Sequence, residues 1–336
     1  MTGLHAGWYL LAFVDELVEE LTPVRLGRRR LMLVRSPRDD GGRGHTLYDA
    51  TCPHRGADLS RGGVLAGECV TCPFHGRRIA LEGAGRRLAP GQHAVRSYPT
   101  LTVGPLVFGR LSAATAGEHG FEQAVRSLLD GRTVVPALRT QTLAPARYVV
   151  ENAFDGEHFG TVHAVPGVRP MTTDRSPGGP LTVRGSFVTR HDPWGGQAQR
   201  DYLAALLGSP PAPHPETLSA FTAAAFSPTL VAAEFGAGDT ASVILTGAVP
   251  DEAGCQVRVA VAGAPGRALE RTVEGARRAL AQDVEVWDHL DPDAPCSLDE
   301  RDAPVVAFQD FCRDFPAAPE TAAAASTAVR AVRDAG

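Results

Sequence analysis

The sequence predicts an α+β protein of two domains, the first built of β-strands alone and the second of strands and helices. Three observations predict this class. The chain of 336 residues is long enough for two domains that each bury a core of their own. Short apolar runs separated by glycines dominate residues 1–115, which is typical of an all-β domain. Residues 116–336 instead alternate strand-like and helical segments.

The elements of the first domain follow in chain order. Apolar runs at residues 8–14 and 31–34 predict strands, and the Gly-Gly-Arg-Gly sequence at 41–44 predicts a turn between them and the next strand. Short glycine-punctuated strands continue to the end of the domain, where residues 104–109 predict a closing strand. The small polar residues at 112–118 then mark the domain boundary.

The second domain begins with a mixed pattern. Four of its segments are strand-like, namely residues 148–150, 181–189, 241–249 and 256–262. One long helix is predicted by an apolar stripe with steps of four and three residues, formed by Leu269, Val273, Ala276, Leu280, Val284 and Trp287. Residues 165–220 are rich in proline and glycine, and the Ala- and Pro-rich tail at 316–336 is expected to be peripheral.

Composition limits the class of protein. A hydrophobic content of 43% with 21% charged residues is typical of soluble globular proteins, and the chain has no stretch of 18 apolar residues that predicts a membrane span. The first 21 residues carry four acidic side chains and no basic segment, so they do not resemble a signal peptide. Four of the six cysteines, Cys69, Cys255, Cys296 and Cys312, are expected to be free thiols. We therefore expect a reducing, cytoplasmic location.

Charge is unevenly distributed along the chain. Every basic residue other than histidine is arginine, and residues 25–110 carry a net +9 against −14 for the remainder of a chain whose net charge is −5. The basic segment has no interleaved aromatic pattern, which argues against nucleic acid as a partner. Docking of an acidic electron donor fits better, because opposite charges accelerate transient encounters. An arginine-rich surface without a partner is the alternative.

Two short motifs concentrate metal-binding side chains in the first domain. Cys-Pro-His-Arg-Gly at 52–56 and Cys-Pro-Phe-His-Gly at 72–76 supply two thiolates and two imidazoles, from Cys52, His54, Cys72 and His75. This set is able to hold a Rieske [2Fe–2S] cluster, in which two cysteines bind one iron and two histidines bind the other. The glycine that ends each motif allows a tight turn around the sulfur. A structural zinc site is the alternative, although zinc sites more often use Cys-x2-4-Cys pairs.

A second cluster of polar side chains lies at the start of the second domain. Asn152, Asp155 and His158 follow at intervals of three, so on one helix they share a side. His163 comes five residues after His158, and the two rings meet one metal only if the helix breaks near Gly160. Two histidines near a carboxylate are typical of a non-haem Fe(II) site with open coordination positions. Ordinary polar roles for both histidines are the alternative.

The third ligand of this site is predicted by helical periodicity. Asp283 lies beside the apolar stripe of the long helix, whereas Glu285 and His289 point to the opposite side. An acidic residue on a buried face requires a metal or a partner. We therefore expect Asp283 to be the carboxylate ligand, with a salt bridge to a buried arginine as the alternative.

Taken together, the motifs resemble the oxygenase (α) component of the Rieske non-haem iron oxygenases over nearly the whole chain. Within this family, the motifs resemble those of 3-ketosteroid 9α-hydroxylase and Rieske sterol desaturases. Besides the Cys/His loops, the resemblance rests on Asn152-x-x-Asp155-x-x-His158-Phe-x-x-Val-His163, Gln282-Asp283-Val-Glu-Val-Trp287 and Phe308-x-x-Phe311-Cys-Arg-Asp-Phe315. It implies a helix-grip catalytic domain after the Rieske domain, and a head-to-tail homotrimer. It also implies that His158, His163 and Asp283 hold the mononuclear iron, and that Asp155 bridges His158 to His75 of a neighbouring subunit. Asp155 and Asn152 are the expected catalytic residues.

The resemblance implies an O₂-dependent hydroxylase, that is, a monooxygenase. Its cofactors would be the [2Fe–2S] cluster and mononuclear Fe(II), with O₂ as co-substrate and with NAD(P)H acting indirectly through a reductase or a ferredoxin. A bulky, largely apolar substrate such as a steroid, a polyketide or another secondary metabolite is expected. Demethylation, dihydroxylation and desaturation use the same apparatus. A pure Rieske electron carrier is a competing class, against which the second ligand set argues. A scaffold subunit is another, and such a subunit would lack the metal-binding residues.

Overall fold

The structure is a computed structural model that describes residues 3–37, 43–83, 92–112, 117–190, 216–236, 238 and 241–319. The chain divides into two compact units. The first comprises residues 1–119, 249–252 and 315–336, and the second comprises residues 120–248 and 253–314. Among the described residues, none of the helices is long and apolar enough to cross a membrane. All six cysteines are free thiols, as expected for the four outside the Cys/His loops.

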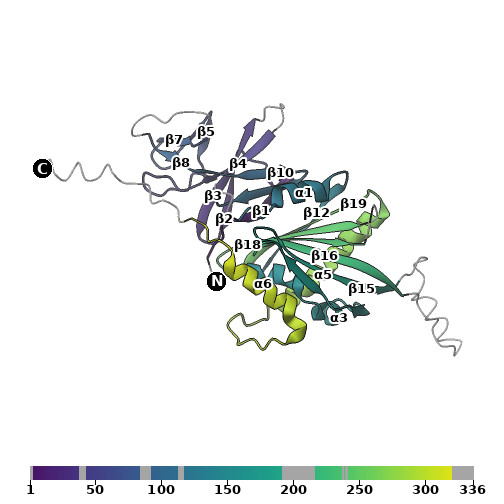
Figure 1. The fold of residues 1–336 in the computed structure, drawn as a ribbon. Helices are drawn as coiled ribbons and strands as arrows, with labels where there is room; N and C mark the ends of the chain where they lie inside the picture. The colour runs from purple at the N-terminus through teal and green to yellow at the C-terminus, as the bar shows by residue number, and fades with distance from the viewer. Residues whose placement is uncertain are drawn as a thin grey trace. The chain divides into compact units, whose positions relative to one another are not determined.

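The first unit is built from three small β-sheets (Figure 1). One has the order β1-β11-β10, from Trp8–Phe13, Leu106–Arg110 and Thr100–Val103. The second has the order β2-β3-β4-β9, from Leu21–Leu26, Arg29–Pro37, Arg43–Asp49 and Ser97–Tyr98, and the short helix η1 (Val14–Glu16) precedes it. The third has the order β5-β6-β7-β8, from Val64–Ala66, Cys69–Thr71, Arg78–Leu81 and Ala94–Val95.

The strands predicted at residues 8–14 and 31–34 are present as β1 and β3. The closing strand begins later than predicted, because Gly104 adopts a φ of 54° in the turn between β10 and β11, a conformation that favours glycine. Residues 104–109 are therefore a turn followed by a strand. The predicted turn at 41–44 and the boundary at 112–118 lie partly outside the described residues.

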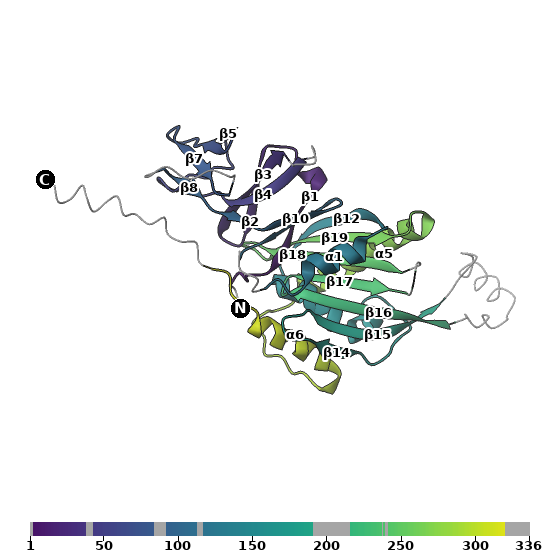
Figure 2. The same ribbon diagram turned by 45° about the horizontal axis from the view of Figure 1, so that its top comes forward.

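The second unit is an eight-stranded antiparallel sheet with helices packed on it. Its order is β12-β19-β18-β17-β16-β15-β13, with β14 paired to β15, and Figure 2 shows this order from β12 to β15. The strands are β12 (Thr133–Thr142), β13 (Gly167–Val168), β14 (Thr172–Arg175), β15 (Leu181–Arg190), β16 (Glu216–Ser227), β17 (Leu230–Phe235), β18 (Ser242–Pro250) and β19 (Cys255–Gly263). The helices are α1 (Phe121–Leu129), α2 (Ala146–Glu151), η2 (Asn152–Phe154), α3 (Glu157–Thr161), α5 (Arg267–Trp287), η4 (Glu300–Asp302) and α6 (Ala303–Asp314). An all-β first part followed by an antiparallel sheet with helices confirms the predicted fold class.

Most of the strands predicted for the second unit are present, but the one at 148–150 is wrong. These residues belong to α2, whose buried side chains Ala146, Val149 and Val150 follow a helical spacing. A short apolar triplet has no period of its own, and only packing decides between helix and strand. Residues 191–215, part of the proline- and glycine-rich segment, lie outside the described residues.

The long helix α5 is the element that the apolar stripe predicted. Its buried side chains pack with those of β12 and β19 in one core that includes Val257, Val259 and Val261. At its C-terminal end, Asp288 Oδ1 accepts hydrogen bonds from Thr142 Oγ1 and the Leu143 amide, which fixes the helix to the end of β12. Asp283 therefore has a fixed position on the inner face of the helix.

The segment after α6 is anchored in the first unit. Ala317 forms a β-bridge with His5, and the amides of Ala6 and Ala318 donate to the carbonyls of Pro316 and Leu4. The Phe315 ring contacts that of His5 at 5.2 Å between centroids. The tail from residue 320 onward lies outside the described residues.

Candidate metal centres

The two Cys/His loops of the first unit have the same backbone structure. The Cys52 amide donates to the carbonyl of Ala57, and the Gly56 amide donates to the carbonyl of Cys52. In the second loop, between β6 and β7, the Cys72 amide donates to the backbone carbonyl of Arg77, and the Gly76 amide donates to the backbone carbonyl of Cys72. The two glycines have φ values of 76° and 67°, which L-residues with a side chain rarely adopt. The repeated Cys-x-x-x-Gly spacing thus builds two matching turns.

Each turn surrounds its cysteine sulfur with amide donors. The Cys52 sulfur receives hydrogen bonds from the backbone of His54 and Arg55, and the Cys72 sulfur from Phe74 and His75. Both cysteines are only 2% exposed. Burial, helped by the neighbouring Cys72, raises the pKa of Cys52. Burial also opposes ionisation of Cys72, yet the amide of Phe74 and the Cys52 thiol together lower its pKa. Amide donors directed at sulfur stabilise thiolate, the form that binds metal.

The two histidines of these loops pair with each other. The rings of His54 and His75 lie 4.8 Å apart between centroids, in an edge-to-face arrangement. Burial, together with the positive charge of Arg77, lowers the pKa of His54, which favours the neutral imidazole that a metal requires. The buried Nδ1 of His54 has no hydrogen-bond partner, so a coordinate bond would satisfy it.

The two cysteine sulfurs therefore lie together on one side of the site, and the two histidine rings lie together on the other. A [2Fe–2S] cluster with two thiolates on one iron and two imidazoles on the other requires this pairing, whereas a tetrahedral zinc ion draws all four donors around a single point. The donor set fits the Rieske cluster, with the amide-lined sulfurs in the core and His75 exposed.

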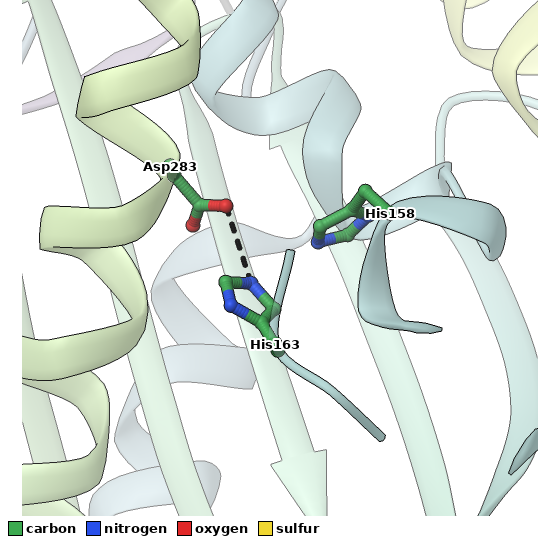
Figure 3. Close-up of side chains that lie close together, drawn as sticks. All are labelled: His158, His163 and Asp283. Atoms are coloured by element: carbon green, nitrogen blue, oxygen red, sulfur yellow. Dashed lines mark ion pairs between the residues drawn. The ribbon is translucent and has the colours of Figure 1, made fainter. Parts of the chain in front are cut away.

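The second unit brings together the three residues that the sequence predicted for a mononuclear metal. The donor atoms of His158, His163 and Asp283 all lie within 4.8 Å of one another. Figure 3 shows their side chains converging from α3, from the segment after α3 and from α5. His163 Nε2 is 3.2 Å from Asp283 Oδ1, and the two histidine rings are 5.1 Å apart at 81°. His158 and Asp283 are 9% and 7% exposed, so the site is largely shielded from water.

Hydrogen bonds fix the orientation of both rings. His158 Nδ1 donates to the backbone carbonyl of Asp155 at 2.9 Å, and His163 Nδ1 donates to Gln282 Oε1 at 3.1 Å. Both acceptors are carbonyl oxygens, so the proton lies on Nδ1 and each Nε2 is left for other partners. Asn152 Nδ2 donates to His158 Nε2 at 3.1 Å. Two rings with Nδ1 held by an oxygen, beside one carboxylate, fit a divalent iron that binds through each Nε2.

The charges at the site differ between the two histidines. Burial lowers the pKa of His158, although the carboxylates of Asp283 and Asp155 offset part of this effect. Burial also opposes protonation of His163, but its hydrogen bond to Asp283 outweighs this and raises the pKa of His163. Asp283 is thus paired with His163, and not with the buried arginine that was the alternative to a metal. A metal ion would take the place of the shared proton.

The backbone reaches this geometry in a different way from the predicted single helix. The helix ends at Glu151, η2 covers Asn152–Phe154, and Asp155 is extended with a φ of −89° and a ψ of 115°. Asp155 Oδ1 then accepts from the Glu157 amide, which starts the separate helix α3. The predicted break after Gly160 is present, because α3 ends at Thr161 and His163 follows it.

One functional position had no predicted role. Gln282 holds the His163 ring, and its sequence signal was its place directly before Asp283 in the motif that carries the resemblance. Asp155, by contrast, contacts His158 mainly through its carbonyl, while its carboxylate is 35% exposed and lies 3.7 Å from His158 Nδ1. Asn152 and Asp155 therefore both lie against His158.

Comparison with known proteins identifies the domain that carries the two Cys/His loops. A family model for the Rieske [2Fe-2S] domain matches residues 7–99. The chain is 30% identical over 178 residues to the chloroplastic pheophorbide a oxygenase of Oryza sativa subsp. japonica, which covers 46% of this chain and 32% of that protein. It is 40% identical over 98 residues to cholesterol 7-desaturase nvd of Bombyx mori, covering 27% of this chain and 21% of that protein. The matched regions thus span less than half of these relatives.

Solved structures show the same fold. NdmA of Pseudomonas putida CBB5 with caffeine superposes with a TM-score of 0.62 at 19% identity, covering 92% of this chain and 90% of that chain. The chain thus contains a Rieske [2Fe-2S] domain at residues 7–99, and over part of its length it is similar to proteins named as an oxygenase and a desaturase.

Proposed function

We propose that this protein is an O₂-dependent hydroxylase for a bulky, largely apolar small molecule such as a steroid, a polyketide or another secondary metabolite. The observation that carries the proposal is the convergence of His158, His163 and Asp283 within 4.8 Å in the same chain as a Rieske domain. Two histidines and one carboxylate leave coordination positions open for O₂. Similarity to a pheophorbide a oxygenase and to a cholesterol 7-desaturase supports a large polycyclic substrate.

The cofactors of the proposal are a [2Fe–2S] cluster on Cys52, His54, Cys72 and His75, and mononuclear Fe(II) on His158, His163 and Asp283. When bound, the cluster supplies single electrons and the Fe(II) activates O₂, so that one oxygen atom enters the substrate and the other leaves as water. The chain itself holds both rings by their Nδ1 atoms, excludes water around His158 and Asp283, and places the Asn152 amide 3.1 Å from His158 Nε2.

Electrons would come from NAD(P)H through a reductase, directly or by way of a ferredoxin. The histidine end of the first site supports a protein partner, because His75 is exposed and Phe74 is 58% exposed. The guanidinium of Arg55 lies 5.7 Å from the Phe74 ring, so this surface combines an aromatic anchor with positive charge. The basic charge of residues 25–110 suits an acidic donor.

A head-to-tail homotrimer is part of the proposal. In it, Asp155 would connect His158 with His75 of a neighbouring copy. The exposure of His75 and the 35% exposed carboxylate of Asp155 support this arrangement, because both groups are accessible from outside their own unit. The four free thiols outside the Cys/His loops support the proposed cytoplasmic location.

Desaturation is the second candidate reaction. It is favoured by the identity of 40% over 98 residues to cholesterol 7-desaturase nvd. Product analysis by mass spectrometry with a steroid probe distinguishes a gain of one oxygen atom from a loss of two hydrogen atoms.

The variant His158→Ala tests the proposed use of the second site. Iron content should fall from about three to about two per chain while acid-labile sulfide stays at about two, and dithionite should still reduce the cluster. Product formation should be abolished. A pure electron carrier would instead keep the wild-type iron content and full electron transfer in this variant, and that result would overturn the oxygenase proposal.

A further inference from the structure

The backbone of Ala164, the residue directly after the candidate ligand His163, has a conformation that alanine rarely adopts. Its φ is 54°, in the left-handed region where the Cβ atom of an L-residue comes too close to the following carbonyl oxygen. Apart from glycines, His119 is the only other residue in the described part of the chain with a positive φ. Glycine is the usual residue in left-handed turns that follow helices. Alanine at position 164 therefore strains the backbone where glycine would not.

The segments on both sides of Ala164 enforce this conformation. The Val165 amide donates to the carbonyl of Phe159 at 2.9 Å, which folds the chain back onto α3. Pro166 comes next, and a residue that precedes proline is disfavoured in the helical region. Immediately after Pro166 the chain enters β13, which pairs with β15. The chain therefore turns sharply between α3 and β13, and Ala164 is the left-handed residue of this turn.

Contacts of the neighbouring histidine, rather than of Ala164 itself, hold the strained turn. Ala164 is exposed, so packing of its methyl group does not offset the strain. His163 Nδ1 donates to Gln282 Oε1 at 3.1 Å, and His163 Nε2 lies 3.2 Å from Asp283 Oδ1 (Figure 3). Strained backbone persists where surrounding contacts fix it, and such residues gather at functional sites. The contacts that build the metal site are thus the ones that keep Ala164 in its left-handed conformation.

Alanine and glycine differ in the freedom that they give to this turn. Glycine adopts the left-handed conformation without strain, but it adopts many other conformations as well. Alanine has fewer conformations available to it, so less freedom is lost when the turn is ordered. Because β13 is paired in the sheet, a rotation of the backbone at position 164 would displace His163. A restricted residue 164 therefore prepares His163 for metal before the metal binds.

We propose that Ala164 is a positioning residue for the mononuclear metal. Its Cβ atom restricts the turn after α3 so that His163 stays directed towards Asp283, and the folded protein carries backbone strain as a result. This inference rests on the proposed metal site and adds to it a residue that contacts no metal. It predicts that a substitution which relieves the strain makes the fold more stable and the binding of metal weaker.

Two substitutions at position 164 test the inference in the full-length protein, with the cluster in place and the mononuclear metal removed by a chelator. Ala164→Gly should lower the equilibrium constant for unfolding in urea about threefold, because glycine is unstrained at this φ. The same variant should raise the dissociation constant for Co(II) about threefold, because His163 gains freedom. Ala164→Asn should also unfold less readily but bind Co(II) like the wild type, since asparagine tolerates the left-handed region and keeps a Cβ atom.

Ala294→Gly is the matched control. Ala294 is an exposed residue between α5 and η4 without a positive φ, so the substitution adds chain freedom in the same unit away from the ligands. This control should bind Co(II) like the wild type and should unfold slightly more readily. A residue with a structural role alone would change the stability of the fold and leave the affinity for Co(II) as it is.

Three results would overturn the inference. The first is a dissociation constant for Co(II) that is unchanged or smaller in Ala164→Gly, and the second is easier unfolding of that variant. The third is equally weakened binding by Ala164→Asn, because restriction by a Cβ atom would then not be the cause. Failure of the wild type to bind Co(II) would refute the proposed metal site itself. Binding by the wild type with the same affinity in Ala164→Gly would refute only the positioning role of Ala164.

Discussion

Replacing Gln282 with leucine should weaken binding of the mononuclear metal without disturbing the [2Fe–2S] cluster. Gln282 Oε1 accepts the hydrogen bond from His163 Nδ1 at 3.1 Å, which fixes both the tautomer and the orientation of that ring. His158 is held by a backbone carbonyl instead, so the substitution affects one of the two histidines only. Gln282→Leu thus isolates the contribution of a single supporting hydrogen bond.

The expected size of the effect follows from the position of Gln282. Loss of such a supporting partner typically costs about 10–100-fold in metal affinity. The Gln282 residue is exposed, so water is able to replace part of the lost hydrogen bond. We therefore expect the lower end of this range, about tenfold or about 1.4 kcal/mol. Gln282→Glu should have the opposite effect, because a carboxylate makes the histidine more basic.

Competition with a chelator for Fe(II) or Co(II), under anaerobic conditions and with the cluster in place, gives the dissociation constant. Gln123→Leu, an exposed glutamine on α1, is the matched control and should bind metal like the wild type. An unchanged dissociation constant for Gln282→Leu would refute the argument that this hydrogen bond prepares His163 for metal. Weaker metal binding by both leucine variants would point to a general loss of stability.

Three further changes have expected outcomes. Burial raises the pKa of the Glu151 carboxyl above its ordinary value of 4.5. The contribution of this group to the free energy of unfolding is therefore fully present below pH 4.5, and it is lost as the pH rises through the pKa that the group has in the folded protein. Glu151→Gln keeps an acceptor for Gln309 Nε2 and should remove this pH dependence of the free energy of unfolding, measured with urea between pH 4 and 8. Identical pH profiles for the wild type and the variant would contradict the prediction. Phe308→Ala removes a fully buried ring stacked 5.0 Å from Phe154 and should lower the free energy of unfolding by about 3–5 kcal/mol. The control Val306→Ala, at a residue that is 37% exposed, should lower it by less than about 0.5 kcal/mol. Equal unfolding midpoints for the two variants would refute the packing role of Phe308. Gly76→Ala places a side chain at a φ of 67° and should lower both the free energy of unfolding, by about 1–2 kcal/mol, and the sulfide content. Gly275→Ala, within α5 and facing open space, should instead stabilise the protein by about 1 kcal/mol. Stabilisation by both substitutions would contradict the argument that alanine is strained at position 76.

The parts of the structure that could be predicted from the sequence are those fixed by local spacing. The two Cys/His loops are turns of five residues, so their sequence determines which groups face the sulfurs. Asp283 was placed correctly because periodicity along α5 separates it from Glu285, and the structure buries one and exposes the other. The break in the helix near Gly160 could be predicted because His158 and His163, five residues apart, point in different directions on a continuous helix and are able to reach one metal only if that helix ends between them.

Features that depend on packing between distant segments were not predictable. Residues 148–150 carry an apolar triplet without a period, and their helix is set by packing. The extended conformation of Asp155 interrupts a spacing that fits a continuous helix. The ring of Phe159 on α3 contacts those of Phe187 and Phe221, whose positions depend on the register of β15 and β16, and no local pattern indicates this. The binding roles of the site residues themselves stay predictions until metal is measured.

The most direct test of the central claim is the content of iron, zinc and acid-labile sulfide in anaerobically purified protein, together with the electron paramagnetic resonance spectrum after reduction by dithionite. Two metal centres in one chain predict about three irons and about two sulfides per chain, with a Rieske-type signal. Zinc without sulfide would contradict the account at its first site. About two irons that do not rise to about three on reconstitution with Fe(II) would contradict it at the second.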